Sequence, residues 1–150
     1  MKKLVVVVAL LLIANAYAGT NVPFEASIDT QAIPSFCGPT CLQLEITGVG
    51  QARQFGHLTL TGLSTVDLAT GHQTGTSTLT AADGSTLTLS FEGTDIPTGP
   101  QDFAFFGEWT ADSGTGRFQG VQGGGTYDGT ASGIPGNLHL EGALNNPGKR

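Results

Sequence analysis

The sequence has few basic residues: six Lys and Arg stand against twelve Asp and Glu. Two of the six, Lys2 and Lys3, precede a short apolar run, so residues 19–150 carry four basic and twelve acidic side chains and a formal net charge of −8. Nucleic-acid binding depends on neutralising phosphates with Lys and Arg, and this balance argues against a nucleic-acid partner. It also disfavours anionic membrane surfaces.

Long hydrophobic runs are absent after the N-terminus. The one clear run, Leu4 to Ile13, follows two lysines and precedes Ala16-Tyr17-Ala18, which is the pattern of a secretory signal peptide with an A-x-A cleavage site. It is too short for a comfortable membrane span. We therefore expect residues 1–18 to be a signal peptide, residues 19–150 to form a single domain with one core, and the protein to be periplasmic or extracellular.

Only two cysteines are present, Cys37 and Cys41, and they flank Gly38-Pro39-Thr40. The stretch is similar to the thioredoxin Cys-Gly-Pro-Cys motif with one residue inserted, but a strand-like run follows where the redox motif needs a helix start. A structural disulfide across a Gly-Pro turn is the favoured interpretation over a redox role. Its chain-entropy contribution is about 2 kcal/mol. Two thiols do not make a zinc site, and His57, His72 and His139 are widely separated, so no metal is expected.

Good helix formers are scarce, whereas threonine and glycine are abundant, with 23 glycines in all. Apolar residues alternate with polar ones, as in Phe24, Ala26 and Ile28, which predicts strands with one buried face. We expect eight strands, over residues 22–29, 42–47, 56–66, 73–80, 85–93, 102–111, 124–131 and 137–143. The fold class is all-β, an eight-stranded antiparallel closed β-barrel, with a β-sandwich as the alternative.

One hairpin can be assigned a register. A three-residue loop at residues 82–84, with Gly84 in the left-handed region, pairs Leu79 with Leu87. A two-residue turn would place Leu79 opposite Thr88 and mix the two faces. The longer loop is preferred, and it puts Leu79, Leu87, Leu89 and Phe91 inside and a ladder of cross-strand threonines outside. Such a ladder is also found on ice-binding surfaces, but threonine is an ordinary strand residue for a solvated face.

The segment DSGTGRFQGVQGGG, residues 112–125, has three interpretations. A dinucleotide site needs Gly-x-Gly-x-x-Gly before a long helix, and the glycine spacing here is one residue longer with no helix-forming sequence after it. An aspartic protease needs two Asp-Ser-Gly-Thr motifs, and the chain has one. The remaining interpretation is a connection between two strands.

The same segment resembles the signature Gly-Gly-(Thr/Ser)-Gly-x-(Phe/Tyr)-x-Gly-(Ala/Val)-x-Gly of plant dirigent proteins and allene oxide cyclases, with Ser113 in place of the first Gly. Residues 50–57 and 79–84 extend the likeness to secreted bacterial proteins of this barrel type. The resemblance implies a calycin-like barrel, often trimeric in the plant families, and a structural role for the signature. Its structural residues are Gly114, Gly116, Arg117, Phe118, Gly120 and Val121, with Phe118 and Val121 facing the barrel and Arg117 closing over one end.

The strand at residues 102–111 is the best material for a pocket. Phe103, Phe105 and Trp109 share one face, and an eight-stranded barrel has room for packed side chains or for one small ligand. Core packing is the ordinary role of such residues. If the opposite face pointed inward instead, Glu108 would lie in an aromatic cavity with a raised pKa and serve as a catalytic acid or base. The candidate ligand-binding residues are Phe103, Phe105, Trp109, Leu89 and Phe91.

These features predict an exported protein that binds an apolar or aromatic small molecule in its barrel, or acts through its surface, without catalysis. The alternative is a cofactor-free cyclase, isomerase or dirigent-like coupling guide for an apolar or phenolic substrate. No cofactor and no integral membrane span are expected, and the resemblance implies a homo-oligomer.

Overall fold

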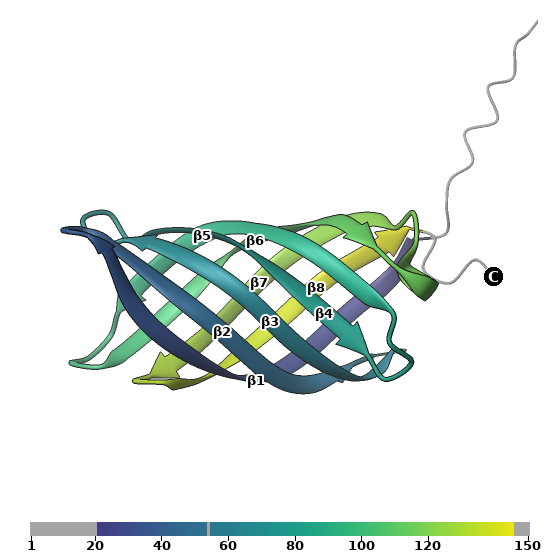
Figure 1. Cartoon of the computed structure of the whole chain (residues 1–150), viewed down its shortest axis with the longest axis horizontal. Coiled ribbons are helices and arrows are strands. Elements are labelled where there is room, and N and C mark those ends of the chain that lie inside the picture. Colours follow the sequence, from purple (N-terminus) through teal and green to yellow (C-terminus); the bar gives the residue numbers. More distant parts are fainter. Residues whose placement is uncertain (1–20, 54, 146–150) are drawn as a thin grey trace, which may run out of the picture.

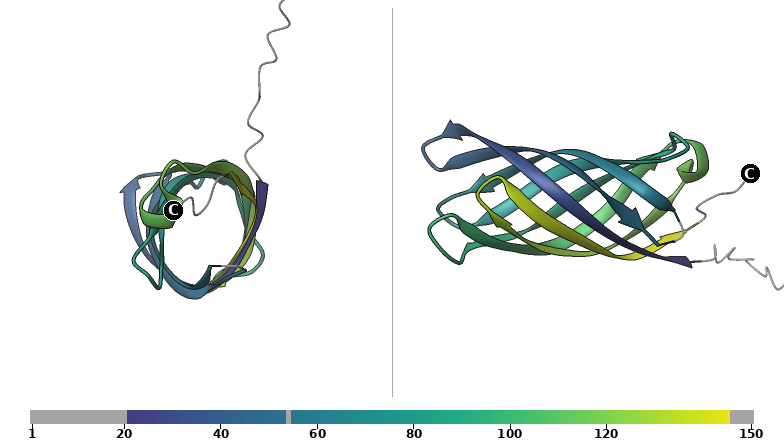
Figure 2. Two further views of the ribbon diagram at one scale, coloured as in Figure 1. Left: turned by 90° about the vertical axis from the view of Figure 1, so that its right-hand side faces the viewer. Right: turned by 90° about the horizontal axis from the view of Figure 1, so that it is seen from below.

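Eight antiparallel strands form a closed barrel in the computed structural model, which describes residues 21–53 and 55–145 (Figures 1 and 2). Each strand pairs with the next, and β8 pairs with β1, so the barrel prediction is confirmed over the sandwich. The predicted signal peptide, residues 1–18, lies outside the described residues. Among those described, no helix is long and apolar enough to cross a membrane. The elements are β1 (Asn21–Gly38), β2 (Cys41–Ala52), β3 (Gly56–Asp67), β4 (His72–Ala81), β5 (Thr86–Pro97), β6 (Asp102–Gly114), the 3-10 turn η1 (Gly116–Phe118), β7 (Gln122–Ser132) and β8 (Pro135–Asn145).

Alternation along each strand sends apolar side chains into the barrel and polar side chains to solvent. On β1, for example, Phe24, Ala26 and Ile28 are buried while Glu25 and Ser27 are exposed. The packed core combines inward residues of all eight strands with residues of two connections, and its largest members are Phe24, Phe55, Leu58, Leu60, Leu79, Leu87, Leu89, Trp109, Phe118, Tyr127, Leu140 and Leu144.

The β4–β5 hairpin has the predicted register, with Leu79 opposite Leu87 and Thr78 opposite Thr88. Gly84 has a φ of 85°, which L side chains rarely adopt and which the three-residue loop requires. Leu79 and Leu87 are fully buried, and the hydroxyls of Thr78 and Thr88 lie 3.3 Å apart on the outer face. The hairpin prediction is therefore confirmed in register and in facing.

The connection between β6 and β7 closes the barrel end at which β1 begins and β8 ends (Figure 1). Gly116 has a φ of 58° and starts η1, and the turn buries Phe118 and Val121 in the core, as the signature implied. Arg117 lies over the rings of Phe55 and Phe118, with its guanidinium carbon 5.5 and 5.8 Å from their centroids. Two further glycines fit the signature, since Gly120 has a φ of 73° and Gly114 lies directly under Phe118.

Two side chains tie this connection to the neighbouring hairpin. The Nε of Arg117 is 3.1 Å from a carboxylate oxygen of Asp83, and its backbone N–H donates to the Ser85 hydroxyl. The Thr115 hydroxyl contacts the Thr86 hydroxyl at 2.7 Å. We call this the closed end of the barrel.

The other end carries four hairpin turns, at residues 38–41, 67–72, 97–102 and 132–135. Here the predicted end of the first strand is wrong, because β1 continues to Gly38 instead of ending at Asp29. Beyond Gln31 it pairs with β2 alone, so a two-stranded hairpin extends past the rim. Pro34 hid the extension in the sequence, and it is tolerated because β1 no longer has a partner on its other side. A disulfide between Cys37 and Cys41 joins the tip of the hairpin, as predicted.

Phe118, Val121 and Arg117 form a plug at the closed end, and truncating Phe118 in this plug should destabilise the barrel strongly. Phe118→Ala empties a site that is 1% exposed, and we expect a loss of about 3–5 kcal/mol in the free energy of unfolding. Phe106→Ala is the matched control, because Phe106 is 49% exposed on the outer face and its loss should change stability by less than about 1 kcal/mol. Urea unfolding of both variants checks this, and equal losses would contradict the assignment of the plug.

Candidate functional site

A cavity of about 1130 Å³ occupies the half of the barrel away from η1. Its walls are inward residues of the eight strands, and its mouth is formed by the turns at residues 67–72, 97–102 and 132–135. The volume is at the upper end of the range for pockets that hold small molecules. Most of the lining is apolar, including Ala32, Pro34, Leu42, Leu44, Ile46, Leu89, Phe91, Phe103, Phe105, Ala131, Leu138 and Leu140.

Aromatic rings lie along the cavity wall because glycines face them on neighbouring strands. Phe105 on β6 pairs with Gly129 on β7, where an added Cβ would lie 2.5 Å from the ring. Phe91 on β5 lies over Gly75 of β4 in the same way. A side chain at either glycine would force the ring toward the barrel axis, so the glycines keep the cavity open.

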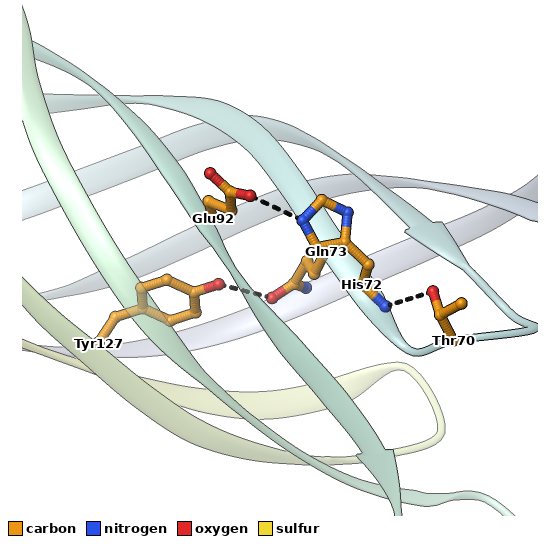
Figure 3. A network of polar contacts seen from close by, with 5 residues as sticks. All are labelled: Thr70, His72, Gln73, Glu92 and Tyr127. Carbon is orange, nitrogen blue, oxygen red and sulfur yellow. Dashed lines mark hydrogen bonds and ion pairs between the residues drawn. The ribbon is translucent and has the colours of Figure 1, made fainter.

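Tyr127 makes the longest of these crossings. Its side chain starts on β7 and passes over Gly107 of β6 and Gly93 of β5. An added Cβ would lie 2.8 Å from the ring at Gly107 and 2.5 Å from the hydroxyl oxygen at Gly93. Its hydroxyl then donates a hydrogen bond of 2.9 Å to the side-chain carbonyl of Gln73 on β4 (Figure 3). Burial raises the pKa of the Tyr127 phenol, and the carboxylates of Asp95 and Glu92 raise it further, so the group is a neutral donor.

Asp95 is the one charged side chain in the cavity lining among the described residues. It lies on β5 near the mouth, opposite Phe105 of β6, and its backbone N–H donates to the carbonyl of Gly71. Its Oδ1 atom is buried and has no hydrogen-bond partner in the protein. Burial raises the pKa of this carboxyl group above its ordinary value of 3.8.

The rim of the cavity exposes large apolar side chains. Phe36, Leu68, Ile96 and Ile134 line the mouth and are 77%, 47%, 43% and 54% exposed. They leave an apolar path between solvent and the interior. Together with the apolar walls, this path gives the cavity the character of a binding site for an apolar body.

Four of the five predicted ligand-binding residues line this cavity: Phe103, Phe105, Leu89 and Phe91. Trp109 does not. It is 2% exposed in the closed half, where its indole N–H donates to the backbone carbonyls of Thr126 and Glu141. Its ring meets that of Phe24 edge-on at 5.6 Å between centroids, so Trp109 is part of the packed floor beneath the cavity.

The conditional placement of Glu108 inside the barrel is wrong. Glu108 is exposed on the outer face of β6, on the same side as Phe106 and opposite Glu92 of β5. The parity of this strand follows Phe103, Phe105 and Trp109 instead, because burying three aromatic side chains outweighs the burial of Phe106.

Three polar residues of the cavity were absent from the sequence prediction: Gln73, Asp95 and Tyr127. Each comes from a different strand, so only the register brings them together. A signal was present for two of them. Asp95 has the same parity as Leu87, Leu89 and Phe91, and Gln73 has the same parity as Leu79. The alternation along β5 and β4 therefore predicts that both side chains face the interior.

The histidines do not enter the cavity. His72 lies on the outer face, where its Nε2 contacts Glu92 at 2.8 Å (Figure 3). Within residues 21–53 and 55–145, no three His, Cys, Asp or Glu side chains are grouped as a metal site would need.

Comparison of the chain with family models, with curated proteins and with solved structures found no match.

Neutralising Asp95 should stabilise the folded protein at neutral pH. Because the pKa of Asp95 is raised in the folded state, the folded protein binds more protons than the unfolded chain between pH 3.8 and that raised pKa. Stability therefore falls as pH rises through this interval. Asp95→Asn removes this loss. We expect its melting temperature to exceed the wild-type value by only a few degrees at pH 7, because Asp95 is half-buried and solvent screens part of the effect.

The difference between the two melting curves should vanish below about pH 3.8, where aspartate is protonated in both states. Differential scanning calorimetry at pH 3, 5 and 7 measures it. A variant that is less stable than wild type at pH 7 would show that the Asp95 carboxylate has a partner in the folded chain.

Adding a methyl group at Gly93 should disturb the Tyr127 crossing. The new Cβ would lie 2.5 Å from the Tyr127 hydroxyl and close to the backbone of β6, so we expect Gly93→Ala to cost about 1–3 kcal/mol. Tyr127→Phe removes the hydroxyl and leaves the ring in place. If the near-ultraviolet circular dichroism of Gly93→Ala matches that of the wild type, the ring has not moved.

Proposed function

We propose that this protein binds an apolar or aromatic small molecule inside its barrel without catalysing a reaction. The observation that carries the proposal is the cavity of about 1130 Å³ with apolar walls, aromatic rings and an apolar rim. Water in contact with these apolar walls is unfavourable. An apolar guest that replaces this water removes apolar surface from solvent, and that burial favours binding.

The size of this gain is modest. A two-ring aromatic guest that buries about 250 Å² gains about 6 kcal/mol at about 25 cal/mol per Å². Part of that gain is lost with the translational and rotational freedom of the guest. We therefore expect dissociation constants in the micromolar range or weaker for simple aromatic probes, and tighter binding for a guest that also satisfies the polar groups of the cavity.

The proposal includes export and membership of the allene oxide cyclase and dirigent-like barrels. Export is supported by the predicted signal peptide at residues 1–18. Membership is supported by the signature at residues 113–123 and by the barrel type that the resemblance implied. A periplasmic or extracellular protein of this kind would meet its ligand outside the cytoplasm.

The second candidate is a cofactor-free cyclase, isomerase or coupling guide. The observation that favours it is the pair of polar groups within the aromatic cavity, the Asp95 carboxyl group with its raised pKa and the Tyr127 phenol held by Gln73. A carboxyl group in such surroundings can act as an acid or a base near neutral pH. Asp95 takes the role of acid or base that the sequence analysis assigned to Glu108 on the condition that its face pointed inward.

Placing a bulky side chain in the cavity should weaken binding. Ala32 lines the cavity from β1, and Ala32→Phe places a ring in it, whereas Gln31→Phe places the same ring on the outer face one residue earlier. The probe is N-phenyl-1-naphthylamine, a neutral aromatic molecule that fluoresces in apolar surroundings. We expect saturable fluorescence with wild type and Gln31→Phe, and at least a tenfold weaker response with Ala32→Phe.

Equal responses from the two variants would show that the probe binds elsewhere, and the absence of saturable binding to the wild type would refute the proposal. Native mass spectrometry of protein purified from its source complements the probe by reporting a co-purified ligand and the number of subunits. A co-purified compound that keeps its mass but changes its chromatographic retention during incubation would support the isomerase.

A further inference from the structure

The cavity contains a charge that the protein does not balance. Asp95 is the one ionisable carboxyl group in the lining of the described residues, and its buried Oδ1 accepts no hydrogen bond from the chain. A carboxylate held in this way loses part of its hydration and gains nothing in return. Among the described residues no cationic side chain balances this carboxylate, so a counter-charge has to enter the cavity with a ligand.

The cations of the barrel lie at its other end. Residues 21–53 and 55–145 contain two basic side chains of the Lys and Arg type, Arg53 and Arg117. Arg53 follows β2 at the closed end and lies 3.7 Å from Glu25, and Arg117 in η1 lies 3.1 Å from Asp83. Both have local carboxylate partners, and neither is in the cavity lining.

The titratable groups around Asp95 do not replace a cation. Glu92 on the same strand is negative, and its outward side chain contacts His72 of β4 on the outer face. The Tyr127 phenol of β7 is neutral, and its hydroxyl already donates a hydrogen bond to Gln73. Two further carboxylates, Asp67 and Asp102, lie at the ends of the strands that form the mouth. Among the described residues, no Lys or Arg lies at the open end to offset these carboxylates.

The aromatic surroundings of Asp95 also suit a positive charge. Phe105 is its cross-strand neighbour, and Phe91 and Tyr127 meet at 5.5 Å between ring centroids in an edge-on arrangement. Ring faces attract cations, and Asp95 supplies the counter-charge beside them. An apolar body attached to a cationic head would find partners for both parts in one cavity.

We infer that the ligand of this barrel is an amphipathic organic amine, with an aromatic or aliphatic body in the apolar cavity and a protonated amino group on the carboxylate of Asp95. The inference rests on the proposed binding function and names the class of ligand. A carboxylate of the same shape is disfavoured by its repulsion from Asp95, and a hydrocarbon leaves the Asp95 carboxylate without a counter-charge.

The test compares three probes that share a naphthalene ring: 2-(2-naphthyl)ethylamine, 2-ethylnaphthalene and the carboxylate 2-naphthaleneacetate. The affinity of each probe is measured by its displacement of N-phenyl-1-naphthylamine from the protein at pH 7. We expect the amine to bind about tenfold or more tightly than the hydrocarbon, and the acetate to bind most weakly, because a hydrogen bond to a charged group outweighs a neutral one.

Asp95→Asn should remove the advantage of the amine and leave the affinity for 2-ethylnaphthalene within about twofold. Glu108→Gln is the matched control, because it removes one carboxylate from the exposed outer face and should leave the ranking of the three probes unchanged. A melting curve of each variant verifies that it is folded.

Two results overturn the inference in distinguishable ways. If all three probes bind with similar affinity, or if Asp95→Asn weakens all three equally, the cavity binds apolar molecules but Asp95 is not a counter-ion, and the proposed function stands alone. If neither N-phenyl-1-naphthylamine nor any of the three probes binds to wild type, the proposed function fails and the inference fails with it.

Discussion

The open half of this barrel depends on glycines that face inward beside aromatic side chains. An eight-stranded barrel is wide enough either to be filled by its own side chains or to hold one small ligand, so a cavity requires that large residues lie along the wall. Gly75, Gly129 and the pair Gly93 and Gly107 provide that space for Phe91, Phe105 and Tyr127. The cross-strand register fixes which ring meets which glycine, because Phe91, Phe105 and Tyr127 each lie opposite a glycine on a neighbouring strand, and Gly93 is the next residue across from Gly107. Aromatic content and empty space therefore coexist in the same half of the barrel.

The closed half uses aromatic residues to the opposite effect. The indole N–H of Trp109 reaches the carbonyls of Thr126 and Glu141, so its ring extends toward β8 and meets Phe24 from β1. Phe55 and Phe118 contact each other from two connections, with Arg117 over both rings. These contacts fill the interior of the barrel from wall to wall. The result is a packed floor and plug that hold the strands in place while the other half remains hollow.

The sequence predicted what depends on alternation within one strand. The inner face of β5 and the register of the β4–β5 hairpin could be worked out because a one-residue slip would expose Leu87, whereas the sequence left open which face of β6 points inward. The length of β1 could not, because its last residues pair with β2 alone and residues 33–37 are exposed on both faces. Trp109 shares its parity with Phe105 but not its level in the barrel, and level is set by strand tilt and register across the sheet. The grouping of Gln73, Asp95 and Tyr127 depends on the same long-range register.

The distribution of charge separates the two halves in the same way as the aromatic packing does. At the closed end each arginine has a carboxylate beside it, so the ion pairs are local and solvated, and they add little to stability. In the open half the Asp95 carboxylate lies among apolar side chains without such a partner, and folding proceeds against its desolvation. A neutral side chain at this position would suit a packed core better. If the barrel binds the amine that we propose, the ligand supplies the counter-charge that the folded chain lacks, and binding offsets the cost of desolvating the carboxylate.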